Sequence, residues 1–124
     1  MLHPLLAVSP VDGRYHKTTA ALSDYFSEYA LFKYRLFVEI EYLIAFSEVI
    51  GTPVSDPELL REIHRGFSLD DCFRVKELEA TTNHDIKALE YFLKERIQSL
   101  PMKLNTEWVH FGLTSQDINN TAIP

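Results

Sequence analysis

The sequence has 124 residues, of which 46% are hydrophobic and 24% charged, a composition that fits one compact globular domain and leaves no room for two. Lys and Arg number 12 against 18 Asp and Glu, and they are scattered along the chain, so nucleic acid is not an expected partner. The single cysteine and the histidines show no spacing typical of a zinc site, and no stretch is apolar enough to span a membrane. Since the N-terminus also lacks the features of a signal peptide, we expect a cytoplasmic protein without a metal.

The N-terminal segment lacks helical periodicity over residues 1–16. Within it, Ser9-Pro10-Val11-Asp12-Gly13 predicts a turn, because proline and glycine favour turn dihedral angles. Arg14 and Tyr15 follow this turn directly. We expect an irregular segment that leads into a short helix over residues 18–25.

A long scaffold helix is predicted next, from a cap at Ser27 to Ile50, with Gly51 available for the left-handed conformation that ends it. Its apolar residues cover a wide arc, which indicates packing against more than one neighbour. Glu39 and Glu41 on this helix are interpreted as part of a solvated face.

Two shorter helices are predicted after the scaffold helix. Asp56 caps the first, which covers residues 57–65 and stops at Gly66. Ser68 begins the second, which runs to about Glu79.

The last two predicted helices begin at related sequences. One begins near Thr82 or Asn83, shows helical periodicity to Leu100 and ends at Pro101. The other begins at Thr114 and is cut off after a few residues, which suggests that a longer protein continues here. The whole pattern predicts an all-α fold.

Both of these helix starts carry the pattern Thr-x-x-Asp, at Thr82 with Asp85 and at Thr114 with Asp117. The pattern is typical of helix caps, in which a hydroxyl and an acid satisfy amides of the first turn. These four residues therefore need no function beyond capping.

Asn83 and His84 are not explained by this capping pattern. A cation is disfavoured at the positive end of a helix dipole, so the imidazole of His84 should tend to be neutral and able to accept a proton or donate a hydrogen bond. Together with the amides and hydroxyls of the same helix end, it would form a cradle for a carboxylate or phosphate. A histidine without a functional role is the alternative.

Arg14 lies beside a turn glycine, where the backbone can approach a ligand and a guanidinium can bind phosphate or carboxylate through two hydrogen bonds. A surface arginine without a ligand is the alternative, and Tyr15 fits a core ring equally well. His110 is interpreted as a loop residue packed under the last helix.

Three segments together resemble the adenylosuccinate lyases, a family of the fumarase and aspartase superfamily. These segments are residues 9–15, 81–95 and 110–120, and they occur in the family's order along nearly the whole chain. The combination is closer to these lyases than to the fumarases, aspartases or argininosuccinate lyases.

The resemblance implies a fold and an activity. Residues 1–112 would form the superfamily's N-terminal helical domain with its irregular first segment, and residues 113–124 the truncated start of the central helical bundle. The enzyme would release fumarate from adenylosuccinate, giving AMP, and from the succinyl-carboxamide ribotide SAICAR, giving AICAR, in purine biosynthesis. It would need no cofactor and would act as a homotetramer.

The resemblance also implies residue roles. Arg14 and Tyr15 would bind the nucleotide phosphate region, and Thr114 and Ser115 the carboxylate end of the succinyl or fumarate group. The substrate site would further include Asn83, His84 and Asp85, with His84 as a possible catalytic residue that orients the substrate or assists proton transfer.

The family's principal acid–base histidine and its base serine lie in segments that this chain does not contain. We therefore expect the chain alone to bind substrate weakly without turning it over. Two further interpretations stay open: a stand-alone helical binding or interaction module whose apolar faces dock a partner, and part of a related fumarate-releasing lyase with a different substrate.

Overall fold

The computed structural model describes residues 3–124, and within that range it contains helices and turns but no strand. The predicted all-α fold is thus confirmed. The chain divides into two compact units, one ending at Leu31 and the other running from Phe32 to Pro124, and each is described by itself. The predicted domain boundary at residue 112 stays a prediction. No helix in the described range combines the length and the apolar character that a bilayer span requires.

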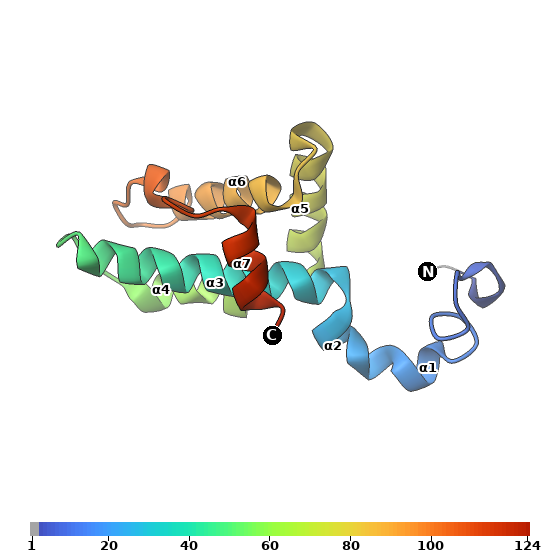
Figure 1. The fold of residues 1–124 in the computed structure, drawn as a ribbon. Helices are drawn as coiled ribbons and strands as arrows, with labels where there is room; N and C mark the ends of the chain where they lie inside the picture. Colours follow the sequence, from blue (N-terminus) through green and yellow to red (C-terminus); the bar gives the residue numbers. More distant parts are fainter. Residues whose placement is uncertain (1–2) are drawn as a thin grey trace. The chain divides into compact units, whose positions relative to one another are not determined.

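The first unit is built from short helical pieces joined by turns (Figure 1). They are η1 (Pro4–Leu6), α1 (His16–Thr19), η2 (Ala20–Leu22), α2 (Ser23–Phe26) and the start of α3 (Glu28–Val49). The prediction of one short helix over residues 18–25 is therefore wrong in detail, because the helical region begins earlier and changes its hydrogen-bond spacing at η2.

The predicted turn after Ser9 is present, with the amides of Asp12 and Gly13 donating to the Ser9 carbonyl oxygen at 3.1 and 3.0 Å. Gly13 is required there for space, since a Cβ at this position would lie 2.4 Å from the carbonyl oxygen of Pro4. The turn residue is thus fixed by the close approach of two backbone segments.

The long helix α3 (Glu28–Val49) follows the prediction closely. Its first turn is capped by Ser27, whose Oγ accepts from the Ala30 amide at 3.1 Å, and it is followed by Gly51 in the left-handed conformation with φ 81°. The interpretation of Glu39 as solvated is wrong, because only 1% of its side chain is exposed. The reason is tertiary: Glu39 faces His110, 71 residues away in sequence.

The second unit packs the remaining helices around α3. They are α4 (Pro57–Arg65), α5 (Leu69–Thr82), α6 (Asp85–Gln98), η3 (Thr106–Trp108) and α7 (Ser115–Ala122). Helices α5 and α6 follow each other along the chain and pack against each other (Figure 1). The core includes Phe32, Leu36, Ile40, Leu43, Leu60, Val75, Leu89, Phe92, Leu93, Ile97 and Ile118, all of them 1% exposed or less.

The helix starts at α4 and α5 are confirmed. Asp56 caps α4 by accepting from the Leu59 amide at 3.2 Å. Ser68 and Asp71 form a reciprocal capping box at α5, with bonds of 3.2 and 3.0 Å between side chains and amides.

The junction between α5 and α6 differs from the prediction. Helix α5 continues to Thr82, and Asn83 ends it in the left-handed conformation with φ 54°, so α6 begins only at Asp85. His84 is the N-cap of α6, and Thr82 is not. Asn83 therefore has a structural explanation that the capping pattern did not reveal, since asparagine tolerates positive φ better than most residues.

Candidate functional site

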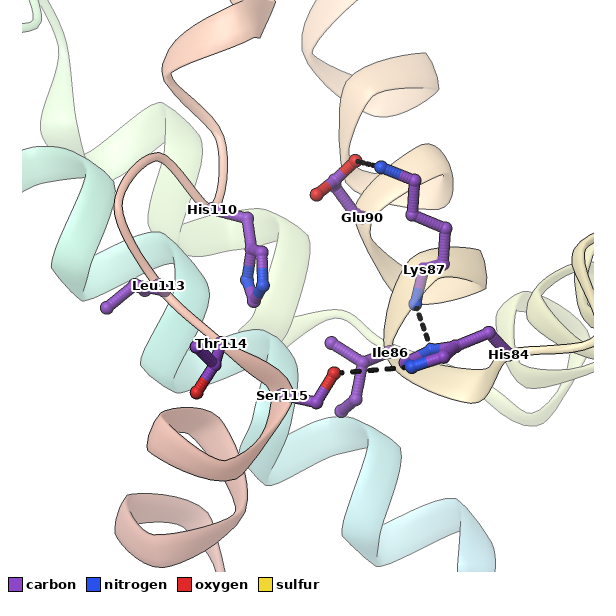
Figure 2. A pocket seen from close by; sticks show the side chains of 8 residues that line it. All are labelled: His84, Ile86, Lys87, Glu90, His110, Leu113, Thr114 and Ser115. Carbon is purple, nitrogen blue, oxygen red and sulfur yellow. Dashed lines mark hydrogen bonds and ion pairs between the residues drawn. The ribbon is translucent and has the colours of Figure 1, made fainter.

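A pocket of about 410 Å³ lies in the second unit, between the first turns of α6 and the loop that leads into α7. Figure 2 shows the side chains on its walls. The lining residues are His84, Ile86, Lys87, Glu90, His110, Leu113, Thr114 and Ser115. Histidine, lysine, glutamate and two hydroxyl side chains in one small pocket suit a polar or anionic ligand.

His84 links the two helix starts that border the pocket. Its Nδ1 accepts a hydrogen bond from the Lys87 amide at 3.1 Å, so Nδ1 carries no proton and the ring proton lies on Nε2. Nε2 lies 3.4 Å from the Oγ of Ser115, the first residue of α7 (Figure 2). His84 thus presents an N–H donor at the point where α6 and α7 begin.

The start of α7 is held by Thr114 and Asp117. The Asp117 carboxylate accepts from the Thr114 amide at 2.8 Å and from its hydroxyl at 3.1 Å, which confirms the predicted capping role of both residues. These bonds from Thr114 lower the pKa of Asp117 below its ordinary value.

Asp85 is paired with a buried arginine. Nη1 of Arg35 donates to its carboxylate at 2.8 Å, while Nε of Arg35 donates to the Asn119 side chain at 2.9 Å. Burial opposes ionisation of Asp85, but the bonds from Arg35 and from the Ile86 amide hold its pKa below the ordinary value. Arg35 therefore ties α3 to the first turn of α6 and to α7, and Asp85 shapes the pocket through this network.

Lys87 and Glu90 belong to the pocket walls and were missed by the sequence interpretation. Nζ of Lys87 donates to the Glu90 carboxylate at 2.9 Å, and Lys94 lies 3.6 Å from the same oxygen. The bond to Glu90 raises the pKa of Lys87, which keeps it cationic. The helical spacing of three from His84 to Lys87 and from Lys87 to Glu90 was the available signal, since it places all three on one face.

His110 lies closer to the site than its interpretation as a loop residue under the last helix suggested. Its backbone is in the left-handed region with φ 61°, and its side chain is largely buried and lines the pocket. Nδ1 lies 2.5 Å from Oε1 of Glu39 on α3. No local sequence signal joins these two residues.

Arg14 and Tyr15 belong to the first unit. The Arg14 guanidinium lies over the Tyr15 ring, 5.5 Å from its centroid. The interpretation of Tyr15 as a core ring is wrong, because 49% of the residue is exposed. Both side chains are thus accessible to a ligand within their own unit.

The described residues hold no group of three or more His, Cys, Asp or Glu side chains that could bind a metal ion. The pocket groups are instead donors, acceptors and one cation. Such a set has the chemistry to bind and orient an anionic organic ligand by hydrogen bonds and charge.

Comparison with known proteins places these residues in a family. A family model described as lyase matches residues 13–124, a range that includes every residue lining the pocket. The chain belongs to this lyase family. The lyase chain is also 51% identical over 132 residues to an adenylosuccinate lyase of Dictyostelium discoideum, a match that covers 99% of the chain.

Two bacterial proteins give similar matches. Adenylosuccinate lyases of Vibrio cholerae and Escherichia coli K12 are 48% and 45% identical to the lyase chain, each over 98% of it. The chain spans 28% of the length of each of these three relatives.

Proposed function

We propose that this lyase chain supplies a substrate-binding wall of an adenylosuccinate lyase active site. The enzyme would release fumarate from adenylosuccinate, giving AMP, and from SAICAR, giving AICAR, in purine biosynthesis. The observation that carries the proposal is the meeting of the α6 and α7 starts at one pocket, where His84 Nε2 and Ser115 Oγ lie 3.4 Å apart. The 45–51% identity to proteins named for this activity supports the choice of substrate.

The proposed reaction is a β-elimination. A base takes the proton from the carbon beside one carboxylate, the C–N bond to the purine or carboxamide nitrogen breaks, and that nitrogen leaves with a proton. Negative charge builds on the carboxylate as the proton departs, so donors that already point at it stabilise the transition state more than the ground state.

The pocket contains suitable donors for that carboxylate. Ser115 offers a hydroxyl at the first position of α7, and Lys87 offers a cation on the opposite wall. Thr114 contributes its place at the helix start, where the first amides of α7 point outward. These groups would bind the succinyl carboxylates and, after elimination, fumarate.

His84 would act on the substrate through Nε2–H. Because Nδ1 is occupied by the Lys87 amide, Nε2 is the nitrogen that can orient the substrate or pass a proton toward the leaving nitrogen. Asn83 and Asp85 flank it, and Asp85 would act by holding the start of α6 against Arg35.

Arg14 and Tyr15 would bind the nucleotide phosphate, a role that suits a planar guanidinium beside an exposed phenol. The remaining proton-transfer groups would come from the rest of a longer protein, which we propose to be a cofactor-free, cytoplasmic homotetramer. The chain alone would bind substrate weakly and would not release fumarate.

The test is fumarate release by the full-length protein that carries this chain, with adenylosuccinate and then SAICAR as substrate. His84→Ala and Ser115→Ala should each lower turnover by at least ~10²-fold, because each removes a positioned donor. Ser55→Ala, in the exposed loop before α4, is the control and should leave the rate unchanged. Fumarate release from a different amino-acid adduct but from neither of these substrates would overturn the proposal in favour of a related lyase.

A further inference from the structure

The burial of Glu39 is unfavourable for the stability of the fold. It sits in the middle of α3 between the buried Leu36, Ile40 and Leu43, and its side chain is 1% exposed. One carboxylate oxygen, Oε2, is buried and forms no hydrogen bond with any of the described residues. An apolar side chain would serve packing better here, since burying a carboxylate with an unsatisfied oxygen is unfavourable.

The other oxygen of Glu39 contacts His110 at the pocket. Oε1 lies 2.5 Å from Nδ1, and Nε2 of the same ring forms no hydrogen bond with the described part of the chain. Figure 2 shows the His110 side chain extending from the loop before α7 into the space between this loop and α6. The backbone of His110 is in the left-handed region, with φ 61°.

We propose that Glu39 is a positioning residue that fixes the neutral His110 ring in the Nδ1–H tautomer, so that Nε2 presents a lone pair to an N–H or O–H group of the bound substrate. The proposal rests on the proposed function, because it assigns this acceptor to the same pocket. A carboxylate accepts from Nδ1–H and thereby selects the tautomer and the orientation of the ring.

The two histidines of the pocket then hold opposite tautomers. His84 accepts a hydrogen bond from the Lys87 amide on Nδ1 and points Nε2–H at the pocket, whereas His110 keeps its proton on Nδ1, donates that N–H to Glu39 and points an unprotonated Nε2 at the pocket. One ring is a donor and the other an acceptor. A substrate with both an anionic group and an N–H or O–H group can satisfy both rings at once.

The charges around Glu39 fit this arrangement. Burial raises its pKa, and the neighbouring His110 opposes that rise. Glu90 adds a repulsion, but its own charge is paired with Lys87 and Lys94. The bond to His110 is thus the main polar contact that makes a buried carboxylate tolerable in α3.

The experiment uses the full-length protein and two readouts. Nitrogen-15 NMR of the histidine rings, with His110 assigned by its loss in His110→Gln, should show Nδ1 protonated and Nε2 unprotonated at neutral pH. Glu39→Gln keeps the shape of the side chain but removes the carboxylate. It should abolish the tautomer preference and lower kcat/KM for fumarate release by about tenfold or more.

The control variant is Glu48→Gln, which removes an exposed carboxylate from the same helix and should change neither readout. Glu39→Asp should recover part of the loss, since a carboxylate returns at a slightly greater distance. A merely structural role of Glu39 would change the unfolding midpoint without moving the His110 tautomer.

The outcomes separate the two proposals. If the unaltered protein releases no fumarate from adenylosuccinate or SAICAR, the proposed function fails, while the NMR readout still decides on Glu39. If the unaltered protein is active but His110 carries its proton on Nε2, or on both nitrogens, the inference about Glu39 is overturned. It is also overturned if Glu39→Gln keeps its kcat/KM.

Discussion

Replacing Arg35 with methionine should destabilise the fold and loosen the pocket. Arg35 is buried in α3 and donates to Asp85 at the start of α6 and to Asn119 on α7. Methionine fills the space of the aliphatic stem but makes neither bond. The change therefore isolates the polar network from packing.

The magnitude follows from the exposure of the partners. Both bonds have the charged guanidinium of Arg35 as donor, and a hydrogen bond to a charged group contributes about 1.5–3 kcal/mol. Asp85 has a side chain that is 43% exposed, so its carboxylate can be rehydrated after Arg35 is lost. This rehydration offsets part of the sum of the two bonds, so we expect a loss of about 2 kcal/mol.

The assay is urea unfolding followed by far-ultraviolet circular dichroism, on Arg35→Met, Asp85→Asn and the double variant. The sum of the losses in the two single variants should exceed the loss in the double variant by about 1 kcal/mol, because the two residues share one bond. Arg35→Lys keeps the charge without the two-bond geometry and should fall between the original chain and Arg35→Met.

The pH dependence gives a second check on the same pair. The pKa of Asp85 is lowered in the fold, so its stabilisation is present above the unfolded pKa of about 4 and is lost as pH falls through the folded pKa. The difference between the original chain and Arg35→Met should shrink in acid. A loss under about 0.5 kcal/mol at neutral pH would refute this account of Arg35.

Three further stability predictions concern single side chains. Ser68→Ala removes one half of the capping box at α5 and should cost about 1 kcal/mol in urea unfolding, and an unchanged midpoint would contradict the cap. Burial lowers the pKa of His64, so stability should be complete above about pH 6.5 and fall as pH drops through the lowered value. His64→Leu should flatten that decline between neutral and mildly acidic pH, and an equal slope in both proteins would count against it. Phe92→Ala in the core should cost about 3–5 kcal/mol by thermal or urea unfolding, and a loss below ~1 kcal/mol would show that the site is not packed as described.

The features that could be predicted from the sequence are local ones. Ser27, Asp56 and Ser68 act as caps through bonds to amides three residues later, and such short-range patterns are visible in sequence. The same holds for Thr114 with Asp117, whose capping role was recognised. Helix type and most helix starts therefore followed from residue spacing.

The features that could not be predicted depend on distant contacts or on backbone conformation. The left-handed Asn83 ends α5 and makes His84 the cap of α6, although Thr82 had the more typical capping sequence. Glu39 was interpreted as solvated because its polar partner His110 lies 71 residues away in sequence. Hydrophobic periodicity carries no information on such a pairing. The sequence therefore predicted only part of the polar lining of the pocket.

The central claim is that this chain forms a substrate-binding wall of an adenylosuccinate lyase. The most direct measurement uses a chimera in which the chain replaces the matching segment of the Escherichia coli relative, which is 45% identical to it. The purified chimera should release fumarate from adenylosuccinate, and His84→Ala within it should lower that rate by at least ~10²-fold. A chimera that elutes at the same size as the Escherichia coli enzyme but releases no fumarate, or whose His84→Ala variant stays fully active, would contradict the account.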